Sequence, residues 1–116
     1  MLNSIYAALD EIRKEEPSIE GAALLHVNGL AIISIGYDES FWVKVSALLS
    51  SLKELSTALN SKPFGVDAVF ESHYIVARSG KRVVAVLVAK PDADLERLDY
   101  LAFRLVEEVE EHLLGL

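Results

Sequence analysis

Hydrophobic positions recur at helical spacing at the start of the chain and then give way to short, continuous apolar runs. The apolar residues at helical spacing in residues 2–15 are Leu2, Ile5, Tyr6, Leu9 and Ile12. This spacing predicts an amphipathic helix that ends before Pro17, because the residue preceding a proline avoids helical angles. The apolar runs 21–27 and 30–35 flank Asn28-Gly29, a pair that favours a tight hairpin turn. Both strands of this hairpin are almost wholly apolar, which predicts a sheet covered on both faces.

The second half of the chain predicts a long helix, three strands and a final helix. Asp38 is a suitable N-cap for a helix reaching about Asn60, and residues 62–65, Lys-Pro-Phe-Gly, break the pattern behind it. Strands are expected at 66–70, 74–78 and 83–89, and Asp92 and Asp94 provide capping chemistry for a helix from Leu95. The element order is therefore αββαβββα. We expect an α+β fold in one domain spanning residues 1–116: a five-stranded, antiparallel, meander-like sheet flanked by three helices.

Size and composition favour a self-sufficient domain that associates with another chain. At 116 residues the chain buries enough surface to fold without disulfides, and it contains no cysteine. Its apolar fraction of 52% and mean hydropathy of +0.30 are high for a small domain, which indicates an oligomer. Scarce Met and absent Gln, beside plentiful Glu, Lys and Arg, suggest a thermophile.

The charge balance argues against several classes of partner. With 18 acidic and 11 basic residues, the net charge of −7 disfavours nucleic acid and anionic membrane surfaces. No apolar run approaches the ~18–20 residues of a membrane span, and the N-terminus lacks a signal-peptide pattern, so we expect a cytoplasmic protein.

Four phrases of the sequence, in their order and spacing, resemble the Roadblock/LC7 domain family, which includes the roadblock-like dynein light chains. They are Ile-Glu-Gly-Ala-Ala-Leu-Leu at 19–25, the turn ending in Gly29 with an apolar strand behind it, the Ala/Leu/Ser-rich helix segment 46–52, and the strand 84–88 leading into Pro-Asp-Ala-Asp-Leu at 91–95. The resemblance extends from about residue 2 to residue 114. One departure is the turn near Ser72 and His73, which is shorter than in many relatives.

The resemblance implies a profilin-like architecture and a non-enzymatic protein without a cofactor. Family members form homodimers or heterodimers in which the third strands pair into one sheet and the second helices lie side by side. The resemblance also implies a scaffold or regulator that binds a Ras-like small GTPase and modulates or localises it. We therefore expect a homodimer with such a GTPase as its partner.

The long second helix carries the first part of the candidate interface. Its apolar residues span an arc of about 140°, wider than the roughly 100° that a surface helix needs, so Trp42 and Leu49 on the flank are surplus. The residues of this arc are Phe41, Trp42, Val45, Leu48, Leu49, Leu52, Leu55 and Leu59. The opposite side holds small or weakly polar residues that let another backbone approach: Val43, Ser46, Ala47, Ser50 and Thr57. We expect Trp42→Ala and Leu49→Ala to weaken self-association and leave a folded monomer. The alternative is a well-buried helix with a serine-rich solvent face.

The strand after this helix carries the second part of the candidate interface: Val66, Asp67, Ala68, Val69, Phe70 and Glu71. At a sheet edge its unpaired backbone groups would favour pairing with a second copy. Asp67 and Glu71 could instead protect that edge from aggregation, and only the family resemblance favours pairing. In an antiparallel pair these carboxylates must avoid facing each other.

Other candidate chemistry has simpler explanations. His26, His73 and His112 lack the spacing of a metal site, and no serine–histidine–acid constellation is indicated. Ser79-Gly80-Lys81 lacks the upstream glycine of a phosphate-binding loop and is interpreted as a hairpin turn, so no nucleotide site is expected. The acidic run 107–111 is expected mostly on a solvated helix face, with a basic partner surface as the alternative.

Two other functions remain open at the level of sequence. A profilin-like or PAS-like small-ligand sensor would need an internal cavity with convergent polar groups, whereas the strands indicate a solid core. A purely structural dimeric adaptor between larger proteins is not distinguished from a GTPase platform.

Overall fold

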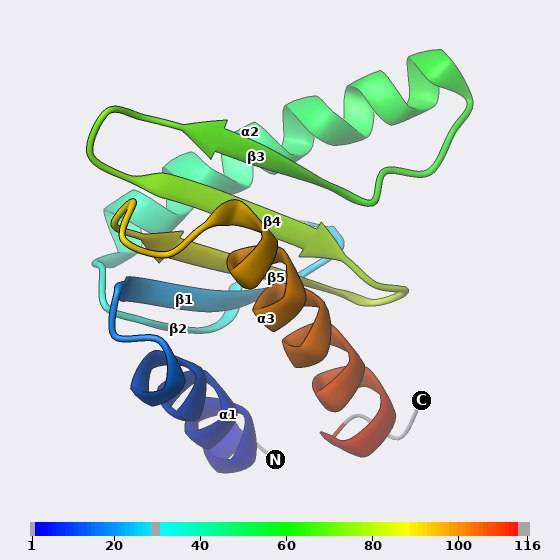
Figure 1. The fold of residues 1–116 in the computed structure, drawn as a ribbon. Coiled ribbons are helices and arrows are strands. Elements are labelled where there is room, and N and C mark those ends of the chain that lie inside the picture. The colour runs from blue at the N-terminus through cyan, green and yellow to red at the C-terminus, as the bar shows by residue number, and fades with distance from the viewer. Residues whose placement is uncertain (1, 29–30, 114–116) are drawn as a thin grey trace.

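In a computed structural model, the chain forms one sheet with helices on both of its faces (Figure 1). The structure describes residues 2–28 and 31–113. Its elements are α1 (Leu2–Glu15), β1 (Ile19–His26), β2 (Ala31–Ile35), α2 (Glu39–Leu59), β3 (Gly65–Val69), β4 (Tyr74–Ser79), β5 (Val83–Ala89), α3 (Leu95–Glu108) and η1, a π-helical turn (Val109–Leu113). The predicted element order and fold class are confirmed. Two positions of the predicted hairpin, Gly29 and Leu30, lie outside the described residues.

The sheet has the order β2-β1-β5-β4-β3, and every neighbouring pair is antiparallel. This order corrects the expected meander. The hairpins β1–β2, β3–β4 and β4–β5 pair locally, but β2 and β3 lie at opposite edges and β1 pairs with β5. β5 is buried along its whole length and β1 along most of it. The two most apolar strands therefore occupy positions where both faces are covered.

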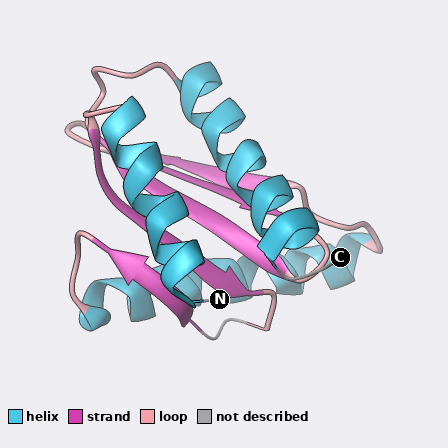
Figure 2. Cartoon of the chain, turned by 90° about the horizontal axis from the view of Figure 1, so that it is seen from below, coloured by secondary structure: helices cyan, strands magenta, loops and turns pink. Residues whose placement is uncertain are grey.

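Each face of the sheet has its own hydrophobic core. α1 and α3 lie side by side over one face, and α2 crosses the other (Figure 2). The larger core joins residues such as Ile5, Leu9, Leu98 and Leu105 to Leu24 and Leu87 of the central strands. On the α2 side, Trp42 and Val45 pack against a set of strand residues that includes Ala23, Leu25, Val84 and Val86. The predicted covering of both faces is confirmed.

Short-range capping defines the helix ends. The side chain of Asp38 accepts a 2.9 Å hydrogen bond from the N–H of Phe41, and that of Asp94 accepts one of 2.7 Å from the N–H of Arg97. Asn60 ends α2 in the left-handed conformation (φ 51°) and donates its N–H to the carbonyls of Ser56 and Thr57. The capping roles predicted for Asp38 and Asp94 are confirmed.

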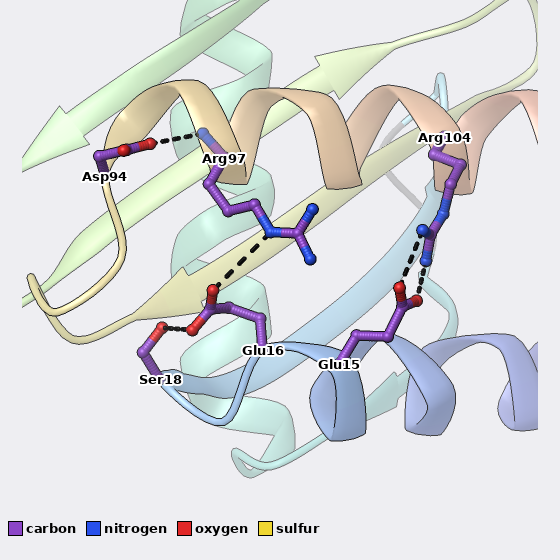
Figure 3. A network of polar contacts seen from close by, with 6 residues as sticks. All are labelled: Glu15, Glu16, Ser18, Asp94, Arg97 and Arg104. Atoms are coloured by element: carbon purple, nitrogen blue, oxygen red, sulfur yellow. Dashed lines mark hydrogen bonds and ion pairs between the residues drawn. The ribbon is translucent and has the colours of Figure 1, made fainter.

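Polar contacts join the end of α1 to α3 (Figure 3). Arg104 of α3 forms a two-pronged hydrogen-bonded pair with Glu15, and the Nε of Arg97 lies 3.8 Å from Glu16. The hydroxyl of Ser18 donates to Glu16 at 2.9 Å. In residues 2–28 and 31–113, no helix combines the length and hydrophobicity needed to cross a membrane.

Candidate interaction surface

β3 is an edge strand, and its surroundings are unusually apolar for exposed surface. It pairs with β4 on one side, while its other side ends the sheet. Val69 is 63% exposed and Phe70, which follows it, is 54% exposed, while Phe64 just before the strand is 79% exposed. Val66 instead points to the α2 side, where it packs against the core. The edge therefore offers both unpaired backbone groups and exposed apolar side chains.

The carboxylate of Asp67 on this edge is paired within the chain. Nη1 of Arg78 lies 2.8 Å from Asp67, and Nε of the same side chain donates to Asp99 of α3 at 2.5 Å. Burial acts to lower the pKa of Arg78, but the hydrogen bonds to Asp67 and Asp99 outweigh it and raise that pKa above its ordinary value. Because the guanidinium stays charged, it offsets the charge of Asp67, which reduces the repulsion expected between two copies of this edge.

Trp42 is part of the chain's own core, which corrects the expectation that it is surplus. Its side chain is 3% exposed and packs edge-on against the rings of Tyr37 and Phe41. Its indole N–H donates to the carbonyl of Tyr37 at 3.3 Å. Leu49 is half-buried against the same core. The apolar arc of α2 is wider than the face that the sheet covers. Periodicity does not show which part of that arc lies over the sheet, so the sequence did not show that Trp42 is buried.

The apolar surplus of α2 lies instead near its C-terminal end. Leu55 is 59% exposed and Leu59 is 73% exposed, although both were expected on the core-facing arc. A helix of 21 residues is about 31 Å long. The last turns of α2 project beyond the strands in Figure 1, so the sheet does not cover these leucines.

The α2 residues predicted for the interface do not all lie on the same side of the helix. Lys53 and Ser50 line a small hollow with His26 and Asn28, so this flank faces the end of β1. Leu55 is two residues beyond Lys53, which places it about 160° away round the helix axis and therefore on the opposite flank. Ser46, Ser50 and Thr57 lie within about 60° of Lys53 and thus on the β1 side. Val43 and Ala47 are exposed on the outer surface. Glu71 is exposed in the turn after β3, whereas Ala68 lies within β3 and is half-buried.

A serine–histidine–acid cluster, which was not expected from the sequence, lies at the other end of β3. Nε2 of His73 is 2.7 Å from Oε1 of Glu20, and Nδ1 of the same ring is 2.8 Å from the hydroxyl of Ser72. The hydroxyl of Tyr37 also donates to Glu20, at 3.1 Å. The histidine and glutamate are separated by 53 residues in sequence, so no local spacing signals the pair.

This cluster is interpreted as a tie between β1 and the β3–β4 turn. A hydrolytic triad needs oxyanion donors and a site from which water is excluded. Here the side chains of His73 and Glu20 are 37% and 33% exposed, and Glu20 also forms an ion pair with Lys90 at 3.8 Å. The hydrogen bond from His73 lowers the pKa of Glu20, while burial and the Glu20 hydrogen bond raise that of Tyr37.

Comparison with known proteins identifies the fold. No protein-family model matches the chain, and no curated protein matches it. A Roadblock/LC7 domain from Streptomyces avermitilis matches with 22% identity and a TM-score of 0.79, covering 94% of this chain and 97% of that one. MglB from Myxococcus xanthus matches with 17% identity and a TM-score of 0.81, covering 97% of both chains. Profilin II from Acanthamoeba castellanii matches with 14% identity and a TM-score of 0.62, covering 94% of this chain and 95% of that one.

The chain therefore has the Roadblock/LC7 fold, within an architecture that it shares with profilin. The family resemblance inferred from the sequence is confirmed at the level of the fold.

Proposed function

We propose that this chain is a non-enzymatic homodimeric scaffold or regulator that binds a Ras-like small GTPase. The observation that carries the proposal is the β3 edge with its exposed apolar residues, together with the exposed leucines of α2. A solved MglB has a tetrameric arrangement, so association of chains occurs within this fold. The GTPase itself comes from the family resemblance of the sequence.

In the proposed dimer, the β3 strands of two copies pair antiparallel and extend the sheet across both chains. Pairing satisfies the edge backbone groups and buries Phe64, Val69 and Phe70. The flanks of the two α2 helices that carry Leu55 and Leu59 then meet on one face. The outer surfaces of the helices, with Val43 and Ala47, form a platform open to the GTPase. Ser46, Ser50 and Thr57 lie on the opposite flank and remain outside this arrangement.

Self-association is tested by light scattering behind size exclusion at micromolar concentration. We expect wild type to elute as a dimer and Leu55→Asp/Leu59→Asp to elute as a folded monomer. The matched control is Ser50→Asp/Thr57→Asp, which places the same charges on the other flank and should remain dimeric. The opposite pattern would assign the interface to the serine flank, and a monomeric wild type would refute the homodimer.

Partner binding is tested by mixing the dimer with Ras-like GTPases from the same genome, each loaded with GDP or a GTP analogue. Co-elution with one nucleotide form, lost in Val43→Asp/Ala47→Asp, supports the platform. A dimer that binds neither form would favour the structural adaptor that the sequence left open.

A further inference from the structure

A hollow of about 270 Å³ lies beneath the C-terminal half of α2. Its apolar lining comes from four parts of the chain: Val27 after β1, Leu49 and Leu52 of α2, Pro63 before β3, and Val84 of β5. The hollow opens at the surface and is not the enclosed cavity expected of a PAS-like sensor. Its apolar residues favour a ligand with a hydrophobic body.

Three lysines from three different elements surround this hollow. Lys53 belongs to α2, Lys62 to the loop behind it, and Lys81 to the β4–β5 turn. All three are exposed, and none forms an ion pair with a carboxylate within residues 2–28 and 31–113. In a chain with 11 basic residues and a net charge of −7, this convergence on one apolar site is a local reversal of charge. Such a rim favours an anionic group.

We propose that this hollow binds a small amphipathic carboxylate with an alkyl body of medium length. The alkyl chain lies on the apolar lining and the carboxylate lies among the lysines. At roughly 30 Å³ for each water-sized group, the hollow accepts about nine non-hydrogen atoms. Octanoate, with about ten such atoms, fits this volume when its carboxylate lies at the lysine rim.

Acidic residues lie beside two of the three lysines. Lys62 and Lys81 also border a second hollow that contains Glu107 and Glu111, on the other side of the β4–β5 turn. Lys53 borders the first hollow but not this acidic one. The backbone N–H of Lys81 also donates to the carboxylate of Glu110 at 2.9 Å, so negative charge lies beside Lys81.

The test of this site does not depend on the proposed dimer. Lys53 lies about 160° round α2 from Leu55, so this rim lysine is on the opposite flank from Leu55. Binding of a carboxylate and self-association are measured separately, and either can fail while the other succeeds.

The experiment titrates ¹⁵N-labelled protein with sodium octanoate and follows the amide chemical shifts. We expect saturable shifts at Val27, Leu52 and Gly80. Lys53→Gln/Lys81→Gln should weaken binding by about threefold to tenfold, because each exposed charge contact adds up to about a factor of five. The control Lys44→Gln removes an exposed lysine on the other side of the same helix and should leave the affinity unchanged. Octylammonium, with the reversed charge, should not bind.

Three results would overturn the proposal. One is equal affinity of the double lysine variant and wild type for octanoate, and another is binding of octylammonium at the same site. The third is a hollow that excludes octanoate and instead takes an acidic, leucine-containing peptide, which would make it a protein-docking site. Thermal unfolding of each variant shows that a lost shift reflects lost binding, since all three lysines are exposed and their replacement leaves the core intact.

Discussion

Glu110 is a buried carboxylate whose partners are backbone amides. It is 8% exposed and accepts hydrogen bonds from the N–H groups of Lys81 (2.9 Å) and Arg82 (2.6 Å). It thereby fastens the β4–β5 turn to η1. Gly80 allows this contact, because a Cβ at that position would overlap the Glu110 carboxylate.

Replacing this carboxylate should destabilise the fold. Glu110→Ala leaves two amides without their partner and should lower the free energy of unfolding by about 1–3 kcal/mol. Urea unfolding measures the change. Glu107→Ala, an exposed glutamate one turn earlier, is the control and should stay within about 0.5 kcal/mol of wild type. Equal effects of the two substitutions would show that Glu110 has no special role.

The pair of Glu20 and His73 predicts a pH dependence. The folded-state pKa of Glu20 lies below its ordinary 4.5 because of its contact with His73. The contribution of this contact to the stability of the fold is therefore fully present above the pKa of Glu20 in the unfolded chain. It is lost as pH falls through the folded pKa. His73→Ala should raise the pKa of Glu20, as measured by NMR titration of the side-chain carboxyl carbon of Glu20. Lys90→Gln should raise it less, since the lysine is 3.8 Å away and its effect is the weakest of those acting on Glu20. An unchanged pKa in His73→Ala would disprove the coupling.

The sequence predicted the acidic run 107–111 only in part. Its helical spacing places these residues mostly on a solvated face, and Glu107 and Glu111 are exposed. Glu110 turns inward where the chain widens into the π-helical turn η1. A π-helical turn changes the angle between successive side chains, so a helical wheel loses its phase there. Long-range pairs such as Glu20 and His73 leave no local signal at all.

At the scale of the element, α2 combines a packed N-terminal half with an uncovered C-terminal half. Trp42→Ala should lower the free energy of unfolding by about 3–5 kcal/mol, because it leaves a large cavity in the α2-side core. This replaces the expectation of a folded monomer that merely associates less. Urea unfolding at one fixed protein concentration measures it. Ser50→Ala, an exposed residue about two turns further along the same helix, is the control and should change little. A stable Trp42→Ala would contradict the core assignment.

The boundaries of α2 were predictable, and its covered face was not. Asp38 and Asn60 mark its ends through local capping, which depends on residues a few positions apart. The expected position of Leu55 and Leu59 was wrong because periodicity defines a face but not the extent of the sheet beneath it. For the same reason, Trp42 was expected to be surplus to the core, although it is buried there.

At the scale of the whole molecule, the contact between α1 and α3 joins the two ends of the described chain. Arg104→Gln should lower the free energy of unfolding by no more than about 1 kcal/mol, since its pair with Glu15 is partly exposed. Glu15→Gln should have a similar effect, and the double variant should lose little more. Chemical unfolding of the four proteins gives the coupling energy, which should shrink at high salt. Additive losses would mean that the pair is not coupled.

The predicted order of elements and the local pairings β1–β2, β3–β4 and β4–β5 are correct, while the expected order of strands in the sheet is not. Hairpins follow from turns and neighbouring apolar runs, which a sequence displays directly. The pairing of β1 with β5 joins residues as distant as Ile19 and Ala89, and it depends on which strands are buried on both faces.

The central position of β5 also constrains how the chain matures during synthesis. β1 and β2 emerge early, but one side of β1 stays without its neighbour until residue 89 has been made. The β3–β4–β5 segment and α3 follow in sequence and can assemble locally before β5 pairs with β1 of the β1–β2 hairpin. Pairing over such separations is slow. An incomplete chain that ends before β5 therefore exposes an apolar strand edge, and this intermediate is the one that a chaperone would have to protect.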